Sequence, residues 1–307
     1  MKRLLSITFL IFFLSEYSHA KNYKNGEIIE DKIFFTGNAG IDLPDGQWTL
    51  ATRYFWNYHA LNIIEYVLVK IENNELMEAI QISETALGGI VTGQIDPILY
   101  EIMFKNKYDG CYERPEYFLL KFYARGHVHN CFTVRHYDLM KEINYPEDPE
   151  LRGSGYQFNK WVENNSITVP KISLFSNHSY FSRHMGSKWW SISYISNTKT
   201  FNAPNNKFYT EETSEYHKYN IENFPKHEKI MQKWVSISAE RHKKFEKNIK
   251  IKKNHELDLS NYYSVIRQTK GKISNEITTQ LQQLNELYKA GVLTKEEFTK
   301  AKKKLLN

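Results

Sequence analysis

The C-terminal end of the chain carries its most regular hydrophobic pattern. Apolar residues recur there at helical spacing and predict one stripe along a first helix, at Ile277, Leu281, Leu284 and Leu287. Gly291 follows where a left-handed residue ends a helix. Thr294 and Glu297 have the spacing of a capping box for a second helix, and Leu293 and Phe298 that of a hydrophobic staple. Phe298, Ala301 and Leu305 continue the stripe, so residues 275–307 are predicted to form a helical hairpin.

The pattern of the preceding body is mostly the two-residue alternation of β-strands. Strands are predicted at 32–36, 47–55, 64–71, 76–83, 98–104, 117–124 and 127–137. The clearest hairpin joins 64–71 to 76–83 across the polar residues 72–75. Residues 151–163 have a short helical pattern, and 172–175 and 189–195 are predicted to pair across a loop rich in His, Ser and Arg.

A long helix is predicted from Pro225 to about residue 249, with Ile230, Trp234, Ile237 and Phe245 as its buried stripe. Residues 250–274 are charged and lack a strong period, which is typical of a linker. The fold class expected is α+β, a mostly antiparallel β body with one long helix on its C-terminal side. The pattern leaves open whether the strands form one curved sheet or two.

The N-terminus has the order of a secretory signal peptide. Lys2 and Arg3 precede the apolar run 4–14, and Ser18-His19-Ala20 provides a small-x-small cleavage site. The alternative is an uncleaved anchor, but a run of 11 residues is shorter than the roughly 20 of a spanning helix. The predicted organisation is a signal peptide at 1–20, an exported domain at 21–250, a linker at 251–274 and the hairpin. We expect a periplasmic or secreted protein after cleavage near Ala20.

The net charge of +6 comes largely from one segment. Residues 240–253 contain seven Lys or Arg and two Glu. This segment is expected to make weak contact with an anionic envelope surface, although a solvated helix face explains the same pattern. An exported protein rarely meets nucleic acid, so no nucleic-acid partner is expected.

The two cysteines, Cys111 and Cys131, predict a disulfide in an oxidising compartment. A bridge closing a loop of this size stabilises a fold by about 3 kcal/mol in the chain-entropy model. A free catalytic thiol is the alternative.

The most suggestive chemistry is His127-x-His129-x-Cys131. Alternate residues of a strand share a face, so His127 and His129 could hold a metal ion, with His178 or His184 as a third ligand. The alternative is a polar turn between Gly126 and Asn130.

The segment 177–184 contains both Ser and His and could belong to a hydrolase, but the chain has no Gly-x-Ser-x-Gly motif. No cofactor is predicted, and the balance favours a protein that is not an enzyme. A periplasmic hydrolase or a metal-dependent enzyme that uses these histidines is the competing class.

The tail resembles a known family. A leucine-rich helix, then Lys-Ala-Gly-Val-Leu-Thr-Lys-Glu-Glu-Phe, then a basic helix ending Lys-Leu-Leu is similar to the short C-terminal domain called SHOCT. The resemblance covers residues 276–306 and implies a bacterial source and a module associated with oligomerisation, without catalytic residues. A lone hairpin of this size needs a surface for its stripe. Self-association or contact with a protein partner is therefore expected through Leu281, Leu284, Leu287, Leu293, Phe298 and Leu305 of a binding or envelope-associated protein.

Overall fold

The computed structural model of the 307-residue chain describes residues 22–34, 40–58, 61–85, 117–125, 128–143, 154–182, 188–204, 210–249, 280–281, 283–285, 288–289 and 293–306. The chain divides into two compact units, Met1–Glu256 and Leu257–Asn307, which are described separately. The predicted signal peptide at 1–20, the strand at 98–104 and the linker at 251–274 lie outside the described residues.

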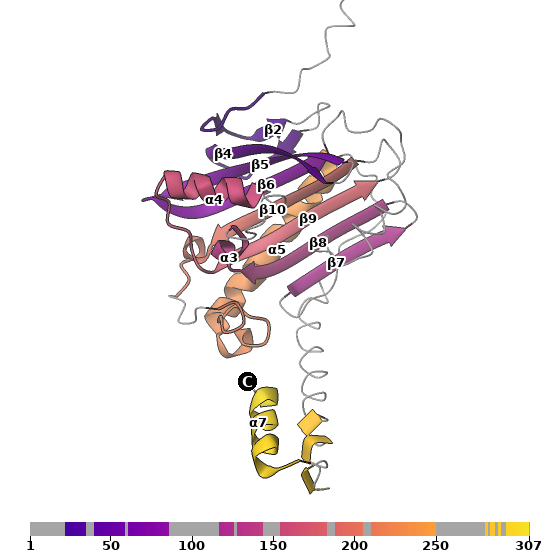
Figure 1. Ribbon diagram of the computed structural model, residues 1–307. Helices are drawn as coiled ribbons and strands as arrows, with labels where there is room; N and C mark the ends of the chain where they lie inside the picture. The colour runs from indigo at the N-terminus through magenta and orange to yellow at the C-terminus, as the bar shows by residue number, and fades with distance from the viewer. Residues whose placement is uncertain are drawn as a thin grey trace, which may run out of the picture. The chain divides into compact units, whose positions relative to one another are not determined.

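The first unit is built on one eight-stranded antiparallel sheet, so its fold class is α+β with a mostly β body (Figure 1). In spatial order its strands are β1 (Ile28–Ile29), β4 (Trp48–Tyr58), β5 (Leu61–Glu72), β6 (Glu75–Thr85), β10 (Lys188–Asn197), β9 (Ser173–Ser182), β8 (Val128–Tyr137) and β7 (Tyr117–Arg125). A second, two-stranded sheet pairs β2 (Lys32–Phe34) with β3 (Gly40–Asp42).

The β5–β6 hairpin confirms the clearest turn prediction. Asn73 and Asn74 connect the strands with φ angles of 50° and 59°. Two consecutive left-handed residues give a turn whose twist matches that of the strands, and Asn tolerates this region better than most residues. The polar pair therefore fixes the register of the two central strands.

One face of the sheet is covered by two helices, α3 (Leu139–Ile143) and α4 (Ser154–Asn164). In Figure 1, α4 lies in front of β5 and β6. Its Phe158 and Val162 are buried with inward-facing strand residues in one apolar cluster, which includes Ala51, Val67, Val69, Ala79, Tyr137 and Ile195. The predicted helix at 151–163 is thus confirmed over most of its length.

The other face is covered by α5 (Pro225–Asn248), which runs behind the sheet in Figure 1 and contacts β3, β8 and β9. Two short 3-10 helices, η3 (Thr198–Phe201) and η4 (Ile221–Asn223), precede it. Trp234 and Phe245 are buried as predicted, but Ile230 and Ile237 are only half-buried. The buried stripe also contains Met231, Val235, Ala239 and His242, which continue it at helical spacing.

The prediction of a polar loop after residue 175 was wrong. Residues up to Ser182 continue β9, which pairs with β10 on one side and β8 on the other. The polar side chains of Ser176, His178 and Ser179 are almost completely buried. They are compatible with a central strand because neighbouring side chains satisfy them by hydrogen bonds, as described below.

The second unit contains helical residues at 280–281, 283–285 and 288–289, followed by α7 (Lys295–Leu306). The predicted capping box is present. The Thr294 backbone N–H donates to Glu297 Oε2 at 2.9 Å, and the Glu297 N–H donates to Thr294 Oγ1 at 3.2 Å. The rings of Tyr288 and Phe298 stack at 4.7 Å and connect the two helical segments. Hydrogen bonds from Thr294 lower the pKa of the Glu297 carboxyl.

Candidate functional sites

A buried histidine pair lies between the sheet and α5. His178 on β9 and His242 on α5 place their Nδ1 atoms 3.1 Å apart, so one ring donates a hydrogen bond to the other. Phe132 on β8 stacks against both rings, with centroid distances of 4.9 and 5.2 Å. Burial lowers the pKa of His178 well below its usual value, and the charges of His242 and Arg241 lower it further. His178 is therefore held in the neutral form.

The pair continues into a polar chain at both ends. Ser176 Oγ lies 3.2 Å from His178 Nε2, and Glu246 Oε1 lies 3.7 Å from His242 Nε2. The Glu246 carboxylate also accepts a hydrogen bond of 2.7 Å from Asn130. Ser, His and Glu are the components of an activated nucleophile. However, Ser176 is completely buried, which keeps a substrate carbonyl from its hydroxyl.

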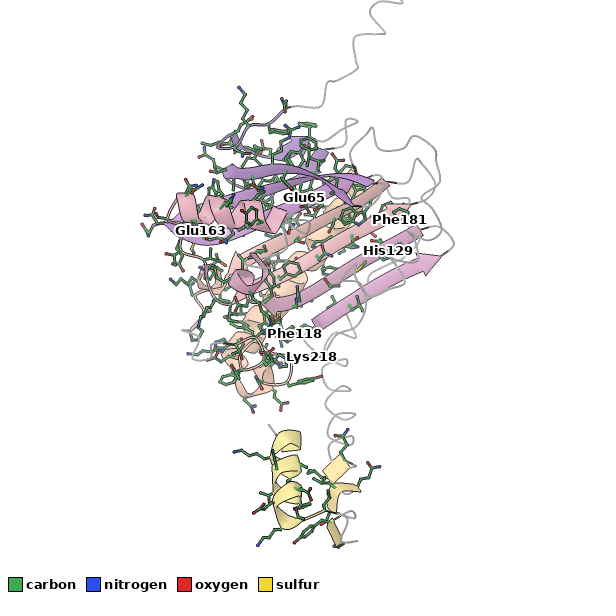
Figure 2. The ribbon with its side chains drawn as sticks, in the orientation of Figure 1. Glu65, Phe118, His129, Glu163, Phe181 and Lys218 are labelled. Atoms are coloured by element: carbon green, nitrogen blue, oxygen red, sulfur yellow. The ribbon has the colours of Figure 1, made fainter. Side chains whose placement is uncertain are left out.

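The histidines expected to act together are separated by the sheet. His129 on β8 is paired in register with Phe181 on β9, and His178 with Phe132, so His129 and His178 point to opposite faces (Figure 2 labels His129 and Phe181). Burial lowers the pKa of His129 to about 4. His127 and His184 lie outside the described residues. Within the described part of the chain, no group of three or more His, Cys, Asp or Glu side chains is placed to hold a metal ion.

A second histidine site lies where the 210–224 segment meets β8. The ring nitrogen Nε2 of His136 lies 3.0 Å from the backbone oxygen of Glu211, and the His217 ring packs edge-on against the His136 ring at 5.8 Å. Burial lowers the pKa of His136 to about 4. This cluster anchors the segment to β8, with His136 in its neutral form.

A polar row crosses the face of the sheet opposite α5. Glu65 on β5 accepts a short hydrogen bond of 2.6 Å from Ser83 on β6. Asn177 on β9 accepts bonds from Ser191 and Ser193 of β10 at 2.9 and 3.1 Å. These side chains satisfy one another across four strands, which explains how serine-rich strands occupy the centre of the sheet.

The predicted disulfide is not tested by the described residues. Cys131 is completely buried on β8, and Cys111 lies outside the described part of the chain. The Cys111–Cys131 bridge stays a prediction.

The hairpin side chains predicted to mediate association are partly accessible. Leu281, Leu284, Leu293 and Phe298 are half-buried, and Tyr288 is 37% exposed. Leu287 and the side chain of Leu305 lie outside what the structure describes. An apolar stripe that remains partly accessible within its own unit can accept a further surface.

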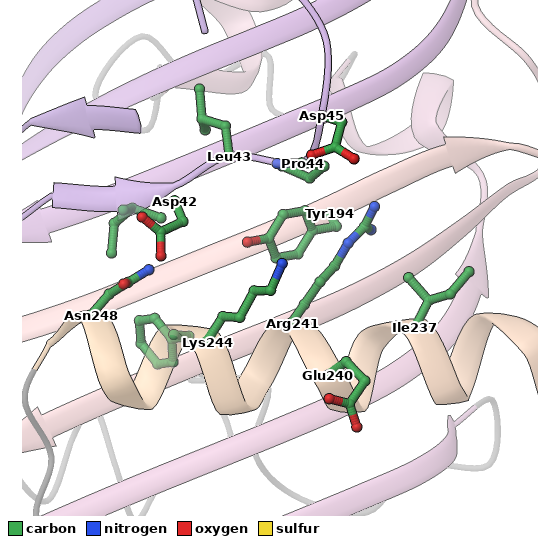
Figure 3. A pocket seen from close by; sticks show the side chains of 12 residues that line it. Asp42, Leu43, Pro44, Asp45, Tyr194, Ile237, Glu240, Arg241, Lys244 and Asn248 are labelled. Atoms are coloured by element: carbon green, nitrogen blue, oxygen red, sulfur yellow. The ribbon is translucent and has the colours of Figure 1, made fainter. Parts of the chain in front are cut away.

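A cavity of about 320 Å³ opens between α5 and the segment after β3 (Figure 3). It is lined by Ile41, Asp42, Leu43, Pro44, Asp45, Tyr194, Ile237, Glu240, Arg241, Lys244, Phe245 and Asn248. This cavity could not be predicted from the sequence, because its walls come from three segments far apart in the chain. The one available signal was the pair Arg241 and Lys244, which share a helix face with Ile237 and Phe245.

Comparison with known proteins identifies only the tail. Residues 279–306 match the family described as the Short C-terminal domain, SHOCT, and the rest of the chain matches no family. The chain has no significant match among curated proteins or among solved structures. In the part of the chain that the structure describes, no helix combines the length and the apolar character needed to cross a membrane.

Proposed function

We propose that this chain is a non-enzymatic, exported binding protein that self-associates through its C-terminal hairpin. The observation that carries the proposal is the SHOCT match at residues 279–306, together with the partly accessible leucines of that segment. A hairpin of this size is below the roughly 40 residues at which an independent domain usually needs oligomerisation or a cross-link. A second copy of the same stripe is the partner of matching chemistry.

The export part of the proposal rests on the N-terminal sequence. Lys2 and Arg3, the apolar run 4–14 and Ala20 have the order of a cleaved signal peptide. The proposed location is the periplasm or the outside of the cell. The Cys111–Cys131 disulfide is proposed as part of the same picture, because such bridges form in oxidising compartments.

The non-enzymatic part is supported by the burial of the histidines. His129 and His178 are completely buried and lie on opposite faces of the sheet. A catalytic base must reach the proton that it removes from a substrate. These two side chains instead stabilise the core, so the body is proposed to bind rather than to convert its ligand.

Contact with the anionic envelope surface is proposed for the exposed side of α5. Lys243 and Lys247 are exposed there, while Arg241 and His242 of the same basic segment face inward. The basic segment is therefore divided between a solvated face and a buried one. Only the solvated face is available for weak electrostatic contact with lipid headgroups.

The self-association is tested by light scattering of two matched variants. Leu284→Asp places a charge on the half-buried stripe, whereas Asn285→Asp places the same charge on the next, exposed residue. The expected result is a multimeric wild type, a multimeric Asn285→Asp variant and a Leu284→Asp variant reduced to one copy. A monomeric wild type, or equal masses for the two variants, would overturn the proposal.

A further inference from the structure

We propose that the cavity between α5 and β3 binds a small organic anion, held by Arg241 and Lys244. The inference concerns the first unit alone and does not depend on association through the hairpin. Figure 3 shows both cationic side chains reaching from one face of α5 toward Tyr194 and Pro44, whereas Glu240 points away from them.

Arg241 is positioned as a preorganised anion-binding group. Its guanidinium carbon lies 4.4 Å from the ring centroid of Tyr194 and 5.0 Å from that of Trp234. Its side chain is only 15% exposed, and its nearest carboxylate, Glu78, lies at 3.9 Å. That distance exceeds hydrogen-bond range, so the guanidinium makes no hydrogen bond to any described residue. A planar cation held by aromatic rings with its N–H donors unused matches a carboxylate or a similar anion.

Lys244 supplies the second charge, one helical turn further along. Its ammonium group makes no ion pair within the described ranges of the chain, whereas two acids that line the cavity have partners of their own. Asp42 pairs with Lys32 at 2.9 Å, and Glu240 pairs with Lys243 at 2.7 Å. When the Asn248 amide is oriented with its nitrogen toward Asp42, it also donates a hydrogen bond of 2.8 Å to Oδ2.

The balance of charge in the cavity is therefore positive. When the ion-pair partners of the lining residues are included, five cations (Arg241, Lys244, Lys32, Lys70 and Lys243) face four acids (Asp42, Asp45, Glu78 and Glu240), which leaves one positive charge. Burial lowers the pKa of the Arg241 guanidinium, which shows that its charge is incompletely solvated. Burial also raises the pKa of Tyr194 to about 12, so its hydroxyl stays neutral and can donate a hydrogen bond. An anion in the cavity would compensate this excess positive charge.

The walls indicate that the anion carries an apolar body. The remaining lining is mostly hydrophobic, from Ile41, Leu43, Pro44, Ile237 and Phe245. A volume of about 320 Å³ lies at the lower end of the roughly 300–1,000 Å³ typical of small-molecule sites. Apolar walls around two cations favour an organic carboxylate or sulfonate over a bare inorganic ion.

The test uses 8-anilinonaphthalene-1-sulfonate, an organic anion of this kind, titrated into the full chain and followed by its fluorescence. Saturable binding to the wild type is expected. Lys244→Glu should weaken it by about tenfold or more, because a charge-assisted contact becomes a repulsion. Lys247→Glu makes the same charge change on an exposed residue of the same helix that does not line the cavity, and it should leave the affinity unchanged. Both positions are exposed, so neither change disturbs the core.

Two further arms make the result decisive. Ile237→Trp fills the cavity without changing its charge and should also abolish the Lys244-dependent binding. Benzoate at millimolar concentration should displace the probe, whereas inorganic phosphate at the same concentration should displace it poorly, if the ligand must be organic. The proposal is overturned if the probe does not bind the wild type or if Lys244→Glu and Lys247→Glu bind it equally. It is overturned equally if phosphate displaces the probe as well as benzoate does.

Discussion

His178 and His242 meet through their Nδ1 atoms, 3.1 Å apart, in the centre of the interface between the sheet and α5. Only one of the two rings can carry the shared proton, so protonation of both would break the hydrogen bond and place two like charges in the core. Phe132 covers both rings and excludes water from them. The main helix is thus attached to the sheet by a contact that requires at least one neutral histidine ring.

We predict that the fold loses stability in mild acid. Burial lowers the pKa of His129 and of His136 to about 4, from 6.5. Below pH 6.5 these two histidines bind protons in the unfolded chain but not in the folded chain. The free energy of unfolding therefore falls as the pH drops from about 6.5 to about 4. Each of the two histidines contributes about 3 kcal/mol over this range. Urea denaturation at several pH values measures the slope.

The control for this prediction removes one titrating group. His136→Gln keeps a side chain able to donate to the Glu211 backbone oxygen but cannot take up a proton in this range. The variant should therefore show a shallower decline in stability between pH 6.5 and pH 4.5 than the wild type. Identical slopes would mean that His136 is not a buried neutral group.

Truncation of Phe158 tests the packing of α4. The side chain is 3% exposed within the apolar cluster of α4 and the sheet. We expect Phe158→Ala to lower the free energy of unfolding by about 3–5 kcal/mol, because the cavity is surrounded by strand residues that cannot collapse into it. Glu163→Ala, on the exposed side of the same helix, should change it by less than about 0.5 kcal/mol. Chemical denaturation of both variants gives the comparison.

The β5–β6 turn provides a test of backbone conformation. Asn74 has a φ of 59°, a region that β-branched residues avoid. Asn74→Val should destabilise the fold by about 1–2 kcal/mol. Glu72→Val, two residues earlier in the extended strand, should be neutral or slightly stabilising because valine favours strands. A smaller loss for Asn74→Val than for Glu72→Val would contradict the assigned turn.

Mass spectrometry without reduction tests the predicted Cys111–Cys131 bridge. The oxidised chain should be lighter than the reduced chain by two hydrogen atoms, and a peptide linking the two cysteines should appear after digestion. Replacing both cysteines by serine should lower the free energy of unfolding by about 3 kcal/mol. Two free thiols in protein purified without reductant would exclude the bridge.

The sequence correctly predicted the elements in which a single hydrophobic periodicity, of a strand or of a helix, runs without interruption. The alternating runs around Ile64 and Leu76 predicted the central hairpin, and the 3.6-residue period after Pro225 predicted α5. The capping box at Thr294 was likewise predictable, because its two partners are three residues apart. Local patterns of this kind need no knowledge of the neighbouring elements.

Patterns that depend on distant partners were not predictable. The local sequence around His178 is typical of a loop. In the structure this residue lies in β9 and is buried by β8, β10 and α5. The order of strands joins β6 to β10, which are separated by more than a hundred residues. The cavity at Arg241 needs the 41–45 segment and Tyr194 as well as α5. In each case the side chain acquires its environment only after folding.

Sedimentation equilibrium of the full chain and of a chain ending at residue 274 tests the central claim most directly. If the hairpin mediates self-association, the full chain should sediment as a multiple of its own mass, and the shortened chain should sediment as a single copy with the same sheet-rich circular dichroism spectrum. The same number of copies for both chains would contradict the account.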